Sequence, residues 1–180
     1  MFFVRITAFV LASFALLGPS QPAQAGESPG GIVSAFYKKH IAMHLTGAPT
    51  PQQLQVIAPY LSQHLQALLE RAWQQHQKDV ARAPDEKPAF TDGDLFSSLF
   101  EGPTSFEILG TETFVHEYAV TVRFTANAGP QQKVWKDVIR LANKQGRLVI
   151  VDIEYGGEWA FAAKGTLVST LEQGMLAAAG

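Results

Sequence analysis

The sequence predicts an α+β domain in which helices come first and a four-stranded antiparallel meander follows. Apolar residues recur with the spacing of a helix face between residues 33 and 80. After residue 100 the spacing changes to the two-residue alternation of strands. The predicted strands are joined by short, turn-rich connections, which favour antiparallel hairpins.

The first half of the chain predicts three helical segments. One covers residues 33–45, with its apolar face repeating at i, i+3, i+4 and i+7. A short helix then begins with Thr50 as N-cap and Pro51 at the first helical position. Pro59 opens a longer amphipathic helix that fades near Arg82. Each long helix has one apolar stripe, so we expect the helices to pack on one face of the sheet.

The second half predicts the strands and a terminal helix. The expected strands are 106–108, 114–124, 134–141 and 148–155, and the helix is 166–176. The expected connections are 110–113, 127–131 and 143–146. We expect the sheet to curl, with the N-terminal helices against it.

The N-terminus predicts export. Arg5 precedes an apolar run, 6–17, that is too short to cross a bilayer. A small-x-small sequence ending at Ala25 follows, which is typical of a secretory cleavage site before Gly26. We therefore expect 1–25 to be a signal peptide, 26–180 to be a single domain, and the mature protein to be periplasmic or secreted.

Composition excludes several function classes. The chain contains no cysteine, which excludes a lipid anchor at the cleavage site, disulfides and thiol chemistry. Its net charge of −2 becomes −3 once Arg5 is removed, and no basic stripe predicts a nucleic-acid partner. No second apolar run reaches the length of a membrane span.

A polar cluster follows from the hairpin geometry expected of the last two strands. If 143–146 is a four-residue loop, Asp137 pairs with Asp152, and Trp135 pairs with Glu154. Opposed residues of an antiparallel pair point to the same face. The two aspartates would therefore lie directly across from each other.

The preceding hairpin extends this cluster. A loop at 127–131 places Arg123 opposite Trp135. A slip of one residue would move every side chain of a strand to the other face, so the cluster depends on this register. The candidate polar cluster is Arg123, Trp135, Asp137, Asp152 and Glu154.

Like charges in direct opposition need a compensating partner. Arg123 could pair with the acids, one carboxyl could stay protonated through a raised pKa, or a cation could bind. In a concave pocket such a carboxylate is a candidate general base. On a convex face it is part of a solvated ion-pair network, and both interpretations stay open.

An aromatic corner closes the last strand. Two adjacent glycines, Gly156 and Gly157, predict a sharp exit with backbone angles that glycine adopts easily. Tyr155 and Trp159 flank this turn. They form either a cap over the core or the lip of a pocket.

Two other patterns are weaker. His40 and His44 lie four residues apart on one helix face, as a metal pair or as core-facing side chains. Asp92 and Asp94 predict a capping turn before a helix at 95–100. Neither pattern completes a ligand set, so we expect no metal and no cofactor.

Several segments carry a resemblance to a known family. They are 59–62, 92–96, 135–138, 152–159 and 165–167. Their combination resembles a family of exported bacterial proteins classified as a domain of unknown function (number 3828). The resemblance implies an α+β cone like that of nuclear transport factor 2 (NTF2-like), in the periplasm or on a membrane surface. It implies no catalytic residues.

Two functions are consistent with these observations. The first is a non-enzymatic binding module for an envelope protein or a small ligand. The second is a small enzyme that uses Asp137 or Asp152 as a carboxylate base inside an NTF2-like pocket. Burial of the two carboxylates distinguishes them, because a base must reach its substrate.

Overall fold

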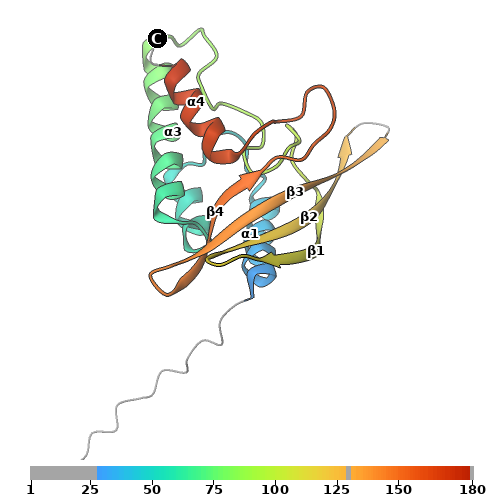
Figure 1. Ribbon diagram of the computed structural model, residues 1–180. Helices are drawn as coiled ribbons and strands as arrows, with labels where there is room; N and C mark the ends of the chain where they lie inside the picture. Colours follow the sequence, from blue (N-terminus) through green and yellow to red (C-terminus); the bar gives the residue numbers. More distant parts are fainter. Residues whose placement is uncertain (1–27, 129–130, 179–180) are drawn as a thin grey trace, which may run out of the picture.

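The computed structural model describes residues 28–128 and 131–178. The predicted signal peptide and cleavage point therefore lie outside the described residues. Within them the chain forms helices followed by a four-stranded antiparallel sheet in the order β1-β2-β3-β4, then a last helix. The predicted α+β class is confirmed (Figure 1).

Side-chain caps begin the helices, and the short second helix and the last helix begin within one residue of the predicted position, whereas the first begins four residues before position 33. The Thr50 hydroxyl oxygen accepts a hydrogen bond from the Gln53 amide, and the Gln53 side-chain oxygen accepts one from the Thr50 amide, which completes a capping box. Thr166 caps the last helix in the same way with Ser169. The helices are α1 (Pro29–Met43), α2 (Pro51–Ile57), a 3-10 turn (Ala58–Tyr60), α3 (Gln63–Arg82) and α4 (Leu167–Ala177).

The long helix does not begin at Pro59, as the sequence predicts. Pro59 lies inside the 3-10 turn, and Leu61 then adopts an extended conformation that bridges to Ile150. Ser62 caps α3 through the Leu65 amide. This extended link ties the start of α3 to the sheet through the Ser62 amide and the Ile150 carbonyl, 2.9 Å apart.

The helices contribute one face each to a shared core. In Figure 1, α1 lies behind the sheet, and α3 and α4 lie side by side beyond β4. Tyr37 of α1 contacts Phe106 and Phe124 of the sheet, with ring centroids 5.8 and 4.7 Å apart. The core is continuous across α1, α3 and the inner face of the sheet. The strands are β1 (Ser105–Thr113), β2 (Glu117–Ala128), β3 (Gln131–Lys144) and β4 (Arg147–Glu154).

The predicted register of β3 and β4 is wrong. The connection is a two-residue turn at Gln145 and Gly146, both with positive φ (54° and 77°), the geometry of tight hairpins. A further shift between Arg140 and Leu141 moves the pairing again. Arg140, rather than Asp137, therefore lies opposite Asp152.

The predicted register of β2 and β3 is also wrong, by one residue. Trp135 pairs with Phe124, and Arg123 pairs with Lys136. This slip moves Arg123 to the outer face, while the two aromatic rings lie together in the core. Burial of two large rings favours the observed register over the predicted one.

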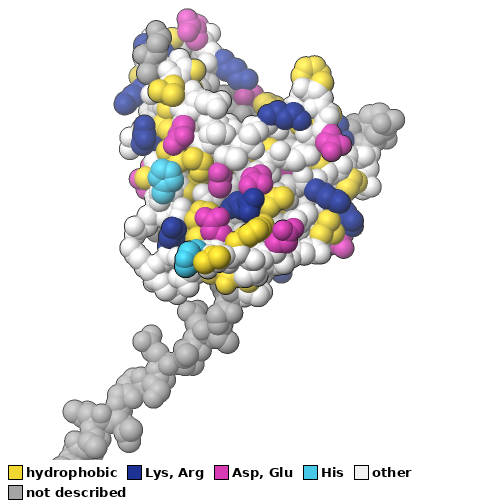
Figure 2. Space-filling view, viewed as in Figure 1, with side chains coloured by type: hydrophobic (Ala, Val, Ile, Leu, Met, Phe, Trp, Pro, Cys, Tyr) yellow, Lys and Arg dark blue, Asp and Glu magenta, His cyan; other side chains and the backbone are white. Residues whose placement is uncertain are grey.

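The outer face of the sheet is a mixed charged surface. Figure 2 shows acidic and basic side chains interspersed over it. Arg123 pairs with Glu107, and Arg140 pairs with Glu154, each at 2.6 Å. These partly exposed pairs are typical of a solvated face, where each contributes little to stability.

No helix in the described ranges is long and apolar enough to cross a membrane.

Candidate functional site

The sheet positions Asp137 in the interior, where it is fully buried. β3 alternates, so Trp135, Asp137 and Ile139 all point inward. The indole Nε1 of Trp135 donates to Asp137 Oδ2 over 3.0 Å. Of the predicted cluster, these two residues alone are in contact with each other.

The Asp137 carboxylate accepts four hydrogen bonds. Besides Trp135, it receives the Ser98 amide at 2.9 Å, the Ser98 hydroxyl, and the Gly156 amide at 2.9 Å. Burial raises the pKa of the Asp137 carboxyl, and its hydrogen bonds from Ser98, Gly156 and Trp135 act in the opposite direction. Both oxygens are occupied by the protein's own donors.

The remaining cluster residues are separated from Asp137. Arg123 and Glu154 belong to the outer-face ion pairs. Asp152 accepts the amides of Ile153 at 2.8 Å and Val168 at 3.0 Å, and so satisfies a free donor in the first turn of α4. The predicted five-residue cluster is therefore not one site.

Two adjacent glycines are required here by close packing, not by special backbone angles. Neither has a positive φ, so the predicted reason is wrong. A Cβ on Gly156 would lie 2.2 Å from the Lys136 carbonyl oxygen. A Cβ on Gly157 would lie 2.8 Å from side-chain atoms of Ala162, Ser98 and Trp159. The chain needs glycine to approach Asp137 and Ser98 this closely.

The predicted lip residues cover the core. The Tyr155 hydroxyl donates to the Leu95 carbonyl over 2.5 Å and is buried. Trp159 packs edge-on against Trp135, with ring centroids 5.9 Å apart, and Lys133 lies over its ring. Phe161, beyond them, is 93% exposed. Tyr155 and Trp159 thus support the cap interpretation.

The segment 93–99 is buried although it has no regular secondary structure. The predicted helix at 95–100 is absent. Irregular backbone in a core needs partners for its polar groups, and the surrounding side chains supply them. Tyr37 donates to the Phe96 carbonyl over 2.8 Å, while Asp137 binds Ser98.

A second buried acid holds the same segment. Asp94 accepts the Phe96 amide at 2.8 Å and the Ser97 hydroxyl at 2.7 Å. His40 Nε2 lies 2.8 Å from Asp94 Oδ1. An ionised carboxylate only accepts, so Nε2 is the donor. His40 Nδ1 is buried without a partner among the described residues.

Asp94, His40 and Ser97 are not arranged as the residues of a nucleophilic catalytic site are. Ser97 and His40 both bind the carboxylate, whereas a serine nucleophile must bond to the histidine. His44 is exposed and ends α1 in a left-handed conformation, so the two histidines form no pair. No cluster in 28–128 and 131–178 could hold a metal.

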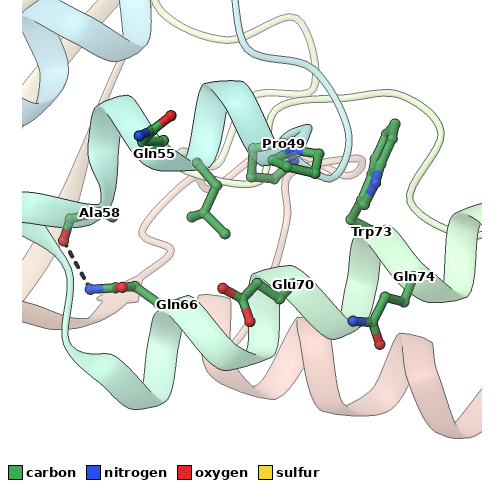
Figure 3. A pocket seen from close by; sticks show the side chains of 9 residues that line it. Pro49, Gln55, Ala58, Gln66, Glu70, Trp73 and Gln74 are labelled. Atoms are coloured by element: carbon green, nitrogen blue, oxygen red, sulfur yellow. Dashed lines mark hydrogen bonds between the residues drawn. The ribbon is translucent and has the colours of Figure 1, made fainter.

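Accessible space occurs elsewhere, in a groove between α2 and α3. Its volume is about 420 Å³, and Pro49 and Leu54 provide apolar lining. Trp73 stands at one end, while Gln66 and Glu70 rise from α3 toward α2 (Figure 3). The full lining is Pro49, Pro51, Leu54, Gln55, Ala58, Gln66, Glu70, Trp73 and Gln74. We call this the α2–α3 groove.

A larger hollow of about 710 Å³ lies by the β3–β4 turn and the start of α3. Its lining includes the basic residues Lys144 and Arg147 and the acidic residue Glu117. The Arg147 guanidinium donates to the Pro59 carbonyl over 2.8 Å. Asp137 and Asp152 line neither space. The sequence patterns do not predict the α2–α3 groove, and its one visible signal is the run of glutamines on the polar face of α3.

No protein-family model matches the chain, and no curated protein or solved structure is significantly similar to it. Function is therefore inferred from the geometry of the chain itself.

Proposed function

We propose that this chain is an exported, non-enzymatic binding module whose α2–α3 groove holds a small ligand. The observation that carries the proposal is the contrast between two kinds of polar side chain. Asp137 is sealed in the core with both oxygens bonded. The polar groups of the groove, led by Glu70, face open space beside the Trp73 ring. Ligand sites combine such an apolar lining with a few polar groups.

The alternative, a carboxylate-base enzyme, is disfavoured by access. A general base must come within hydrogen-bond distance of its substrate. Asp137 has no exposed surface, and Asp152, which is half-buried, lines neither the α2–α3 groove nor the hollow by the β3–β4 turn. Releasing Asp137 would break the bonds that hold segment 93–99.

The finer fold and the location are part of the same proposal. A four-stranded meander with α1 against its inner face is consistent with an NTF2-like cone, the fold implied by the sequence resemblance. A basic residue, an apolar run and a small-x-small site support secretion to the periplasm. An envelope protein is the second candidate partner.

Thermal melts of the purified exported chain test the groove. Small polar metabolites are added one at a time to wild type and to Glu70→Trp, whose indole would fill the groove from an exposed helix position. A ligand at a hundred times its dissociation constant adds about 2.7 kcal/mol, a shift of a few degrees. We expect a shift in wild type that the variant loses.

Glu101→Gln is the matched control, because Glu101 is exposed and lies outside the groove lining. It should keep the full shift. A ligand that stabilises Glu70→Trp as much as wild type would place binding elsewhere. Absence of any shift across a broad panel would contradict the small-ligand proposal and favour a protein partner.

A further inference from the structure

We infer that the ligand of the α2–α3 groove carries a protonated amine on an apolar body. This inference rests on the proposed function and adds the chemical class of the ligand. It follows from which hydrogen-bonding atoms the groove leaves free, and from the charges that line it.

The Gln66 side chain has a fixed orientation. Its Nε2 donates to the Ala58 carbonyl and to the Leu61 carbonyl, each over 2.9 Å. Two carbonyl oxygens can only accept, so the nitrogen must face them and the amide oxygen must face away. Figure 3 shows this oxygen on the side of Glu70. Gln66 therefore offers the groove an acceptor.

Glu70 adds a second acceptor on the same helix face. It lies four residues after Gln66 on α3, so the two side chains are neighbours. Its carboxylate has no ion pair or side-chain hydrogen bond with another residue in the described ranges. No lysine, arginine or histidine lines the groove. The pair thus presents a negative, accepting site.

The rest of the lining suits an apolar body. Pro49 and Leu54 are buried on the α2 side, and Trp73 forms the far wall. One face of the Trp73 ring is stacked on His76, with centroids 5.5 Å apart, which holds the indole in place. An ammonium group has three donors and one positive charge, which matches Glu70 and Gln66. An alkyl chain attached to it would lie along the prolines and Leu54.

Three probes of equal length test the class: n-hexylammonium, hexan-1-ol and hexanoate. Affinities are measured by isothermal calorimetry with the exported chain. Hexylammonium should bind at least about tenfold more tightly than hexanol, because its ammonium adds a charge–charge attraction to Glu70 and brings three donors where the hydroxyl brings one. Hexanoate should bind most weakly, since Glu70 repels it.

The variant Glu70→Gln removes the negative charge of this side chain and keeps its size. It should remove about tenfold of the preference for hexylammonium over hexanol, because the charge–charge attraction is lost while the amide oxygen can still accept from either probe. Glu101→Gln should leave both affinities unchanged. Glu70 is exposed on α3, so neither substitution removes a buried contact.

Each other result overturns the inference. Equal or tighter binding of hexanol or hexanoate would refute the amine class, as would an unchanged preference in Glu70→Gln. Failure of hexylammonium to bind would refute it too. The proposed function has its own test. If a metabolite raises the melting temperature of wild type and Glu70→Trp abolishes that rise, the proposed function stands even where the amine class is refuted.

Discussion

Replacing Asp137 should destabilise the protein strongly. Asp137→Ala leaves the Ser98 amide, the Ser98 hydroxyl, the Gly156 amide and the Trp135 indole without their acceptor in the core. A buried donor without a partner costs about 1–3 kcal/mol. The structure around the four donors can relax in part, so the total loss of stability is smaller than the sum of four such costs. We expect a loss of about 4 kcal/mol, a large share of the roughly 5–15 kcal/mol of a typical domain.

Asp137→Asn is the matched comparison. Its amide can keep one accepting oxygen, and the Ser98 hydroxyl can turn to accept from the new NH2 group. The Gly156 amide, which faces the same position as that hydroxyl, then loses its acceptor, and the turned hydroxyl gives up the acceptor of its own proton. The expected loss is about 1–2 kcal/mol, clearly below that of alanine.

Urea unfolding followed by tryptophan fluorescence measures both variants, since Trp135 contacts the altered side chain. Asp85→Ala is the control, because Asp85 is exposed, and it should stay within about 0.5 kcal/mol of wild type. An Asp137→Ala protein within that same margin would refute the structural role of this carboxylate.

Three further predictions concern neighbouring features. Gly156→Ala should destabilise by more than about 2 kcal/mol in the same urea assay, since its Cβ would lie 2.2 Å from a backbone oxygen; unchanged stability would contradict the close approach. Asp152→Ala should cost about 1 kcal/mol by freeing the Val168 amide, and circular dichroism should show that the remaining helices stay intact. Burial, with Asp137 and Asp94 nearby, raises the pKa of Tyr37. Unfolded tyrosine releases its proton near pH 10, so stability should fall by about 1.4 kcal/mol per pH unit above that point, and a Tyr37→Phe protein with an equally steep loss would contradict this.

The sequence predicted the order and type of most elements because their signals are local, but the predicted connection at 110–113 is wrong, since β1 continues to Thr113 and β2 begins at Glu117. The Thr50 cap, Pro51, and the alternation of β2 and β3 are each decided by a few neighbouring residues. The predicted start of α3 at Pro59 is wrong, because proline is also accepted in a 3-10 turn, where Pro59 lies. The extended Leu61 depends on its bridge to Ile150, which no local pattern reveals.

The prediction of a five-residue polar cluster is wrong because it depended on the register of the strands. The sequence predicts a four-residue loop at 143–146, but Gln145 and Gly146 adopt positive φ and form a two-residue turn between paired Lys144 and Arg147. Glutamine is unusual at the first position of such a turn, where Asn, Asp or Gly is preferred, so the residue types do not predict a two-residue turn. A one-residue slip exchanges the two faces of a strand, which is why Arg123 lies outside while Trp135 and Asp137 lie inside.

The partners of Asp137 come from two distant segments of the chain and from β3 itself. Ser98 lies in an irregular segment and Gly156 in the turn after β4, and only the fold brings them to β3. Trp135, two residues away on the same face, was the one contact that alternation alone could predict.

The most direct test of the binding proposal is an amide chemical-shift titration of the isotope-labelled exported chain with n-hexylammonium or a stabilising metabolite. We predict saturable shifts that cluster on α2 and on α3 around Gln66, Glu70 and Trp73, and that disappear in Glu70→Trp. Shifts centred on Asp137, Ser98 and Gly156, or scattered over the surface, would contradict the assignment of the α2–α3 groove as the site.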